Sequence, residues 1–189
     1  VEFDKSFERN CLVDVACVGI GKINDIVLAE AKNIGDQIIL VGGNTGRDGV
    51  EGVTFASKNL TDKSESDRAS VQIPDPFTKK LLIEATLESI DKGVVAGLKD
   101  LGGGGLTCAL SEMANKGNSG ADVDISKIII REKDMKPEEI LISESQERML
   151  FIINKTSQTS FIKILEKYDL DYSIIGTVIK TPYLKIRHK

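Results

Sequence analysis

The sequence predicts an α/β (α+β) domain in which helices pack on the faces of a mixed β-sheet. Short runs rich in valine and isoleucine, which are typical of buried strands, recur along the chain. Segments with the apolar spacing of amphipathic helices alternate with these runs, and this alternation favours helices packed on a sheet. With 189 residues, 41% of them hydrophobic, the chain is long enough for one sizeable core. We therefore expect residues 1–189 to form a single domain.

The composition argues against several classes of partner. The formal net charge is −4, so the chain has no basic field and we do not expect it to bind nucleic acid. No apolar run approaches the length of a membrane span, and the N-terminus carries no charged-then-apolar leader. We therefore expect a soluble protein without a membrane partner. The chain begins at Val1 rather than at a methionine, which suggests a piece of a longer protein.

The cysteines favour the cytoplasm. The spacings of Cys11, Cys17 and Cys108 fit neither a zinc site nor a disulfide framework. Two of the three lie in apolar runs, where we expect buried free thiols. Because free thiols persist in a reducing compartment, the expected localisation is cytoplasmic.

The N-terminal part of the chain is expected to supply strands. Residues 11–20 are rich in valine with partial alternation, which is typical of a strand, and residues 26–29 are expected to pair with them across a turn. Residues 37–41 have the composition of a buried strand. This strand runs directly into a glycine-rich loop at residues 42–49.

Two charged side chains are adjacent in this loop. Arg47 could bind a phosphate or a carboxylate through its fork of donors, with Asp48 orienting the guanidinium. The alternative is a local salt bridge in the turn that binds no ligand. The local sequence leaves both interpretations open.

A polar segment and a helix follow. Residues 58–70 are almost without apolar side chains and predict a mobile excursion that could serve as a lid. Asp75 is placed as the N-cap of a helix that has proline at its first position, runs to about Lys92 and is ended by Gly93. Gln72 lies just before this helix. It is either an exposed strand residue or an amide donated to a ligand at the positive end of the helix.

The chain is organised around residues 94–109, VVAGLKDLGGGGLTCA. A short strand ends at Asp100, and a helix opens at Leu106. Free N–H groups at a glycine-rich helix start can bind an anion, and an acid beside a phosphate is useful as a ligand for Mg²⁺. The alternative is a tight corner with Asp100 as a turn residue. The candidate phosphate loop consists of Gly102, Gly103, Gly104 and Gly105.

The second candidate region precedes a strongly apolar strand. The hexad 143–148, SESQER, places successive polar groups at the start of this strand, where they are costly unless they meet a ligand, a partner or water. We expect Asp100 and the hexad to share one edge of the sheet and to face a common hollow. The remaining elements expected in this half are a helix at 106–116, a strand at 121–125, a helical turn at 137–142, a strand at 149–153, a helix at 156–168 and strands at 172–179 and 183–187.

Three long blocks match the motifs of one enzyme family. They are GGNTGRDGVEGVTFAS at 42–57, DPFTKKLLIEATLE with GLKDLGGGGLTCALSEMA at 75–114, and ISESQERML at 142–150. Together they resemble the synthetase subunit of phosphoribosylformylglycinamidine synthase, and the similarity runs from about residue 10 to residue 179. The matching part is the C-terminal domain of its first unit, a domain type shared with aminoimidazole ribonucleotide synthetase.

The resemblance implies an ATP-dependent carbon–nitrogen ligase of purine biosynthesis. Such an enzyme activates the formamide oxygen of formylglycinamide ribonucleotide (FGAR), and ammonia from a glutaminase subunit then gives the amidine. The implied partners are FGAR, the rest of the synthetase chain, the glutaminase subunit and a small accessory subunit. ATP would be bound mainly by a preceding domain that is absent here, so the resemblance places no catalytic residue in this chain and the isolated domain is expected to be inactive.

The resemblance also assigns residues. It implies that Asp100 is a Mg²⁺ ligand, and that the side chains contacting substrate are Gln72, Glu144, Ser145 and Gln146. The sequence departs from the family pattern at Pro74, where a glycine is expected, and at Gly103 and Gly104, where alanines are usual. None of these changes removes a functional group. Two alternatives stay open, namely another member of the superfamily, such as aminoimidazole ribonucleotide synthetase or selenophosphate synthetase, and a non-catalytic phosphate-binding module.

Overall fold

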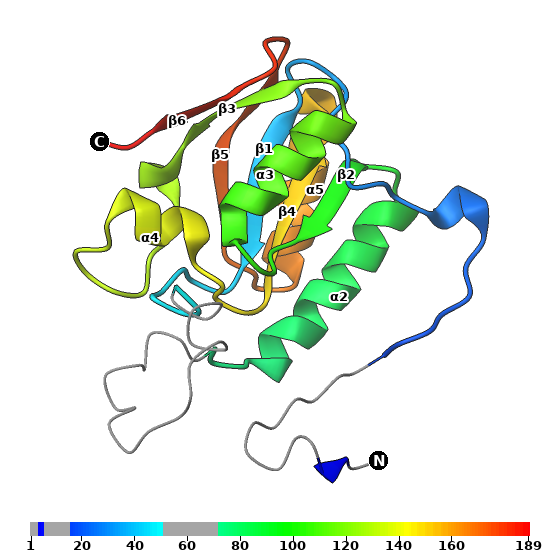
Figure 1. The fold of residues 1–189 in the computed structure, drawn as a ribbon. Helices are drawn as coiled ribbons and strands as arrows, with labels where there is room; N and C mark the ends of the chain where they lie inside the picture. Colours follow the sequence, from blue (N-terminus) through cyan, green and yellow to red (C-terminus); the bar gives the residue numbers. More distant parts are fainter. Residues whose placement is uncertain (1–3, 6–15, 51–71) are drawn as a thin grey trace.

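The computed structural model describes residues 4–5, 16–50 and 72–189, which contain one six-stranded sheet with helices on both faces (Figure 1). The strands are β1 (Gln37–Gly42), β2 (Val95–Asp100), β3 (Gly120–Asp124), β4 (Arg148–Ile153), β5 (Tyr172–Ile179) and β6 (Leu184–Arg187). The helices are α2 (Pro76–Asp91), α3 (Gly105–Lys116), α4 (Pro137–Ile142) and α5 (Gln158–Lys167), with short 3-10 turns at Ile23–Asp25, Ile125–Lys127 and Lys155–Ser157.

The sheet has the order β2-β4-β1-β5-β3-β6. The neighbouring pairs are antiparallel except β3 and β6, which are parallel. The predicted mixed sheet is therefore confirmed. The polar excursion expected at 58–70 lies outside the described residues.

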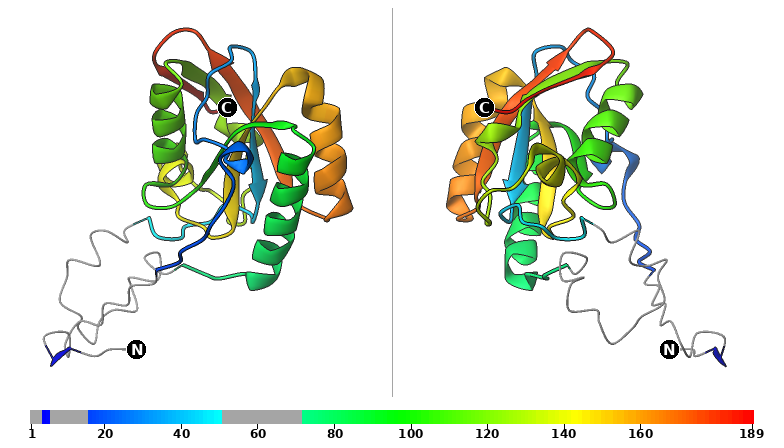
Figure 2. Two further views of the ribbon diagram at one scale, coloured as in Figure 1. Left: turned by 90° about the vertical axis from the view of Figure 1, so that its right-hand side faces the viewer. Right: turned by 60° about the vertical axis from the view of Figure 1, so that its left-hand side comes forward.

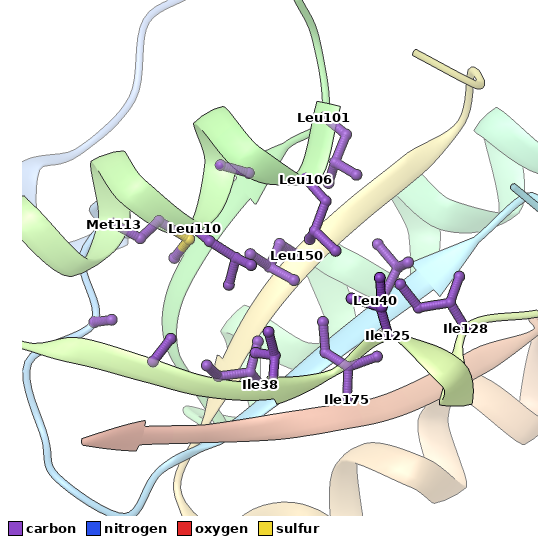
Figure 3. Packing of buried hydrophobic residues seen from close by; sticks show 14 of the residues in the cluster. Ile38, Leu40, Leu101, Leu106, Leu110, Met113, Ile125, Ile128, Leu150 and Ile175 are labelled. Atoms are coloured by element: carbon purple, nitrogen blue, oxygen red, sulfur yellow. The ribbon is translucent and has the colours of Figure 1, made fainter. Parts of the chain in front are cut away.

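The central strand β1 is buried on both faces because helices cover both sides of the sheet, as the two views of Figure 2 show. Ile38 and Leu40 belong to the core under α3 (Figure 3), whereas Ile39 and Val41 belong to the core under α2 and α5. Successive side chains of a strand point to opposite faces, so a continuous apolar run is what a doubly covered strand requires.

The predicted signals at the helix ends are confirmed. The carboxylate of Asp75 caps α2, since its Oδ1 accepts a hydrogen bond of 3.0 Å from the Thr78 N–H. Gly117 is the C-cap of α3. Leu82 of α2 is fully buried against the sheet, whereas Phe77 and Leu87 are 70% and 55% exposed.

Two predictions in the N-terminal part are wrong within the described residues. Residues 16–20 form no strand and are exposed, and residues 26–29 are irregular. The backbone O of Leu28 accepts one hydrogen bond of 3.3 Å from the Leu98 N–H, but this contact does not extend into a ladder. An apolar run forms a strand only where a neighbouring strand pairs with it. The thiol of Cys17 is accordingly exposed rather than buried, and Cys108 is half-buried.

Within the residues that the structure describes, none of the helices combines the length and the apolar character needed to cross a membrane.

Candidate functional site

The pairing of β2 with β4 brings the two candidate regions together. Asp100 lies opposite Met149, and the N–H of Leu101 donates a hydrogen bond of 3.2 Å to the backbone O of Arg148. Because the strands are antiparallel, the end of β2 and the start of β4 share one edge, at the lower end of the sheet in Figure 1. The expectation that Asp100 and the hexad 143–148 lie at a common edge is confirmed.

The glycine corner lets the start of α3 approach this hexad closely. Gly104 and Gly105 have φ values of 77° and 55°, in the left-handed region that glycine adopts without strain. A Cβ atom added to Gly105 would lie 2.2 Å from the backbone O of Ser143. The close packing of α3 against the hexad therefore depends on the absence of a side chain at Gly105.

The carboxylate of Glu144 fills this corner. Its Oε1 accepts a hydrogen bond of 3.2 Å from the Gly104 N–H, and its Oε2 accepts one of 2.9 Å from the side-chain amide of Gln72. The backbone N–H of Glu144 donates to the backbone O of Asp48 at 2.7 Å. Three segments distant in the sequence thus converge on Glu144, and the positive end of α3 holds a carboxylate of the chain itself.

The two other substrate residues predicted in the hexad have different surroundings. Ser145 is 1% exposed, and its hydroxyl accepts a hydrogen bond of 2.8 Å from the Gly46 N–H and contacts the carboxylate of Asp48. Gln146 is half-buried, and its side-chain amide donates to the backbone O of Glu144 at 3.1 Å. In this structure Ser145 links the hexad to the glycine-rich loop, and Gln146 binds the backbone of Glu144.

Arg47 and Asp48 do not act on one another as the sequence suggested. Arg47 donates to the carboxylates of Glu139 and Glu132 at 3.1 and 3.2 Å, and the hydrogen bond to Glu139 raises the pKa of the guanidinium. Asp48 is buried and accepts from Nη2 of Arg131 at 2.7 and 2.8 Å. Both the orienting role of Asp48 and the local salt bridge are therefore wrong. The counter-charges come from residues more than 80 positions away, which local sequence cannot reveal.

The sequence reasoning missed Arg148, which is 2% exposed at the first position of β4. Its guanidinium donates to the backbone O atoms of Ser145 and Ser143 at 2.9 and 2.6 Å and to the hydroxyl of Thr45 at 2.9 Å. Burial lowers the pKa of this arginine to about 10. An arginine that opens an otherwise apolar strand was the signal in the sequence.

Asp100 is exposed at the end of β2, and among the described residues no group of three or more histidine, cysteine or acidic side chains could hold a metal ion. Mg²⁺ is commonly held by one or two carboxylates, with phosphate oxygens and water completing its octahedron. A single exposed carboxylate fits this mode of binding. A cavity of about 280 Å³ lies between the end of β1 and the start of α2, but neither Asp100 nor Glu144 lines it, so it is not the common hollow expected from the sequence.

Comparison with known proteins identifies the family. The family model described as AIR synthase related protein, C-terminal domain, matches residues 33–189. The chain belongs to this family. A curated relative of the AIR synthase related domain is the phosphoribosylformylglycinamidine synthase subunit PurL of Pyrococcus horikoshii, which is 53% identical over 182 residues. The alignment covers 96% of this chain and 26% of the relative, so the chain spans about a quarter of the length of the curated relatives it matches.

Solved structures agree with this assignment of the AIR synthase related domain. Thermotoga maritima PurL complexed with FGAR has a TM-score of 0.80 and 41% sequence identity, covering 88% of this chain and 28% of that protein. The same protein complexed with ATP has a TM-score of 0.74 and 36% identity, covering 88% of this chain and 25% of that protein. The fold and the family resemblance expected from the sequence are confirmed.

Proposed function

We propose that this domain contributes the substrate contacts and one Mg²⁺ ligand of a phosphoribosylformylglycinamidine synthase. The observation that carries the proposal is the convergence of Gln72 and Gly104 on the carboxylate of Glu144. The family resemblance implies substrate contacts at Gln72 and Glu144, and the glycine pattern predicts a phosphate loop that includes Gly104. Their meeting at the edge where Asp100 ends β2 supports one joint site.

The proposed reaction consumes ATP to activate the formamide oxygen of FGAR. Ammonia from the glutaminase subunit then displaces the phosphate, which leaves formylglycinamidine ribonucleotide, ADP and phosphate. The name of the P. horikoshii relative and the FGAR and ATP complexes of T. maritima PurL support this reaction class. We propose that ATP is bound mainly by a preceding domain, and that the glutaminase and small accessory subunits complete the complex.

Each side chain has a chemical part in this proposal. The carboxylate of Glu144 is acceptor-only, so it suits hydroxyl or N–H groups of a substrate, while the amides of Gln72 and Gln146 can donate and accept. Ser145, which is buried, would act by linking the hexad to Gly46 and Asp48 rather than by touching substrate. Asp100 would hold Mg²⁺, which when bound neutralises phosphate charge.

The test is an assay of the whole enzyme that contains this domain. The enzyme is supplied with FGAR, ATP, Mg²⁺ and ammonium chloride, and the amidine product is measured by mass spectrometry. We expect product from the whole enzyme and none from the 189-residue chain alone, because positioning ATP against FGAR needs groups from both parts.

Two controls separate the alternatives. Turnover of formylglycinamidine ribonucleotide or of selenide in place of FGAR would favour another member of the superfamily, and the 53% identity with PurL argues against this. Failure of the whole enzyme to act on any of these substrates would favour a non-catalytic module. Amidine formation by the isolated chain would contradict the proposed division between domains.

A further inference from the structure

We infer that Arg148 is the positioning residue of the substrate site, and that its guanidinium holds the backbone around Glu144 in place. This inference rests on the function proposed above and adds a residue to which that function assigns no role. Arg148 does not reach the surface, since it is 2% exposed, so it acts through the groups that it binds.

The guanidinium of Arg148 binds the backbone of the hexad on both sides of Glu144. Its Nη2 donates to the backbone O of Ser143 at 2.6 Å, and its Nε donates to the backbone O of Ser145 at 2.9 Å. These two carbonyl groups flank the residue whose carboxylate meets Gln72 and Gly104. Because both neighbours of Glu144 are bound by one rigid planar group, the backbone of Glu144 cannot turn without breaking a buried hydrogen bond.

The same residue connects the hexad to two other segments. Its Nη1 donates to the hydroxyl of Thr45, in the glycine-rich loop, at 2.9 Å. Its backbone O accepts the hydrogen bond of 3.2 Å from Leu101, directly after Asp100. The side chain of Arg148 therefore connects the hexad to the glycine-rich loop, while its backbone connects the hexad to the exit of β2.

The electrostatics of Arg148 favour positioning over simple charge pairing. Its hydrogen bonds go to neutral oxygens, while the carboxylate of Asp48, which attracts it at longer range, is bound by Arg131. Burying a cation without a directly bonded carboxylate is costly, and here three hydrogen bonds to buried oxygens offset that cost. Retaining arginine here is explained by its ability to bind three separate oxygens in a fixed plane.

The experiment measures steady-state kinetics of the whole enzyme with three variants. Arg148→Met keeps the length and apolar stem but removes all the donors, and Arg148→Lys keeps the charge with a single donor group. Thr45→Val is the matched control, because it removes only the bond to the loop and leaves the grip on Ser143 and Ser145. Each variant is assayed for the KM of FGAR and of ATP and for kcat.

If Arg148 positions the substrate site, its substitution should weaken the kinetics for FGAR and leave the KM of ATP nearly unchanged. In Arg148→Met we expect kcat/KM for FGAR to fall about 100-fold, mainly through KM, with the KM of ATP within about twofold of the unmutated enzyme. The kcat/KM of Arg148→Lys for FGAR should lie between the values of Arg148→Met and the unmutated enzyme. Thr45→Val should change the KM of FGAR by less than about threefold. A purely structural role would instead lower kcat through loss of active enzyme and leave both KM values unchanged.

Two kinetic results would overturn the inference. A folded Arg148→Met enzyme with an unchanged KM for FGAR would overturn it, and so would equal increases in the KM of FGAR and ATP. If Arg148→Met does not fold, Arg148→Lys decides by the same criterion. The unmutated enzyme must first make amidine from FGAR, and its failure to do so would refute the proposed function rather than the role of Arg148.

Discussion

The backbone N–H of Gly104 donates a hydrogen bond of 3.2 Å to Oε1 of Glu144, and this contact ties the start of α3 to a loop 40 residues further along the chain. The N-terminus of a helix attracts negative charge, so this carboxylate stabilises the corner in the absence of a ligand. An anionic ligand at the glycine corner would have to displace Glu144 or be accompanied by a cation. The glycine corner and the hexad therefore work as one unit.

Glu144→Gln tests whether the charge of Glu144 stabilises the contact between the glycine corner and the hexad. The substitution keeps the shape of the side chain but removes its charge, so the free energy of unfolding should fall by about 0.5–1 kcal/mol. The KM of the whole enzyme for FGAR should also rise. The measurements are denaturant unfolding and steady-state kinetics, with the exposed Glu166→Gln on α5 as control. Equal behaviour of the two variants would show that the contact between Gly104 and Glu144 has no energetic role.

Gly105→Ala tests the close approach of α3 to the hexad. The new methyl group would lie 2.2 Å from the backbone O of Ser143 at a φ of 55°, so we expect a loss of at least about 1–3 kcal/mol in the free energy of unfolding. Gly102→Ala is the matched control, because a Cβ there meets no atom within 4 Å. Similar unfolding midpoints for the two variants would contradict the packing described at this corner.

The sequence predicts the elements that carry their own local signals. The apolar run of β1, the cap and proline that open α2, and the glycine that closes α3 each depend on neighbouring residues, and each is confirmed. The strands predicted within residues 16–29 do not form, because a strand also needs a neighbouring strand to pair with. The valines and isoleucines of this segment do not indicate whether such a neighbour is present. Secondary structure is thus predictable here where the determinants are local.

The candidate site was also predicted only in part from the sequence. The register of β2 and β4 confirms the shared edge, which followed from an acid at one strand exit and a polar hexad before another strand. The partners of Arg47 and Asp48 could not be predicted, since Glu132, Glu139 and Arg131 reach them only through the tertiary fold. Arg148 was missed because a charged residue at the start of a strand usually indicates solvent, whereas here buried carbonyl groups surround it.

Asp48→Asn should destabilise the chain because it removes the charge of a buried carboxylate that Arg131 binds. Asp48 is 4% exposed and accepts two contacts from Arg131, which is itself partly exposed, so we expect a decrease of about 1–3 kcal/mol in the free energy of unfolding. Glu132→Gln changes a more exposed partner of Arg131 and should cost less. Urea unfolding of both variants checks the order, and a larger loss in Glu132→Gln would contradict the assignment.

The chain should lose stability in acid partly through Glu88. Hydrogen bonds from Lys167, Lys92 and the hydroxyl of Tyr168 lower the pKa of this carboxyl from 4.5 to about 2. A lowered pKa in the folded state contributes stability that is complete above pH 4.5 and is lost as the pH falls towards about 2. Glu88→Gln should therefore flatten the dependence of unfolding free energy on pH in this window. An unchanged slope would show that the cluster between α2 and α5 contributes nothing.

Asp100→Asn tests the proposed metal ligand. Because Asp100 is exposed at the end of β2, the substitution should leave the unfolding midpoint nearly unchanged. A carboxylate that binds Mg²⁺ directly contributes charge that an amide lacks, so the Mg²⁺ concentration for half-maximal activity of the whole enzyme should rise at least about tenfold. Asp91→Asn, at the exposed end of α2, is the control and should leave the magnesium titration unchanged. If Asp100→Asn and Asp91→Asn give the same titration curve, Asp100 is not a metal ligand, and the polar edge of the sheet would bind substrate without contributing to the metal site.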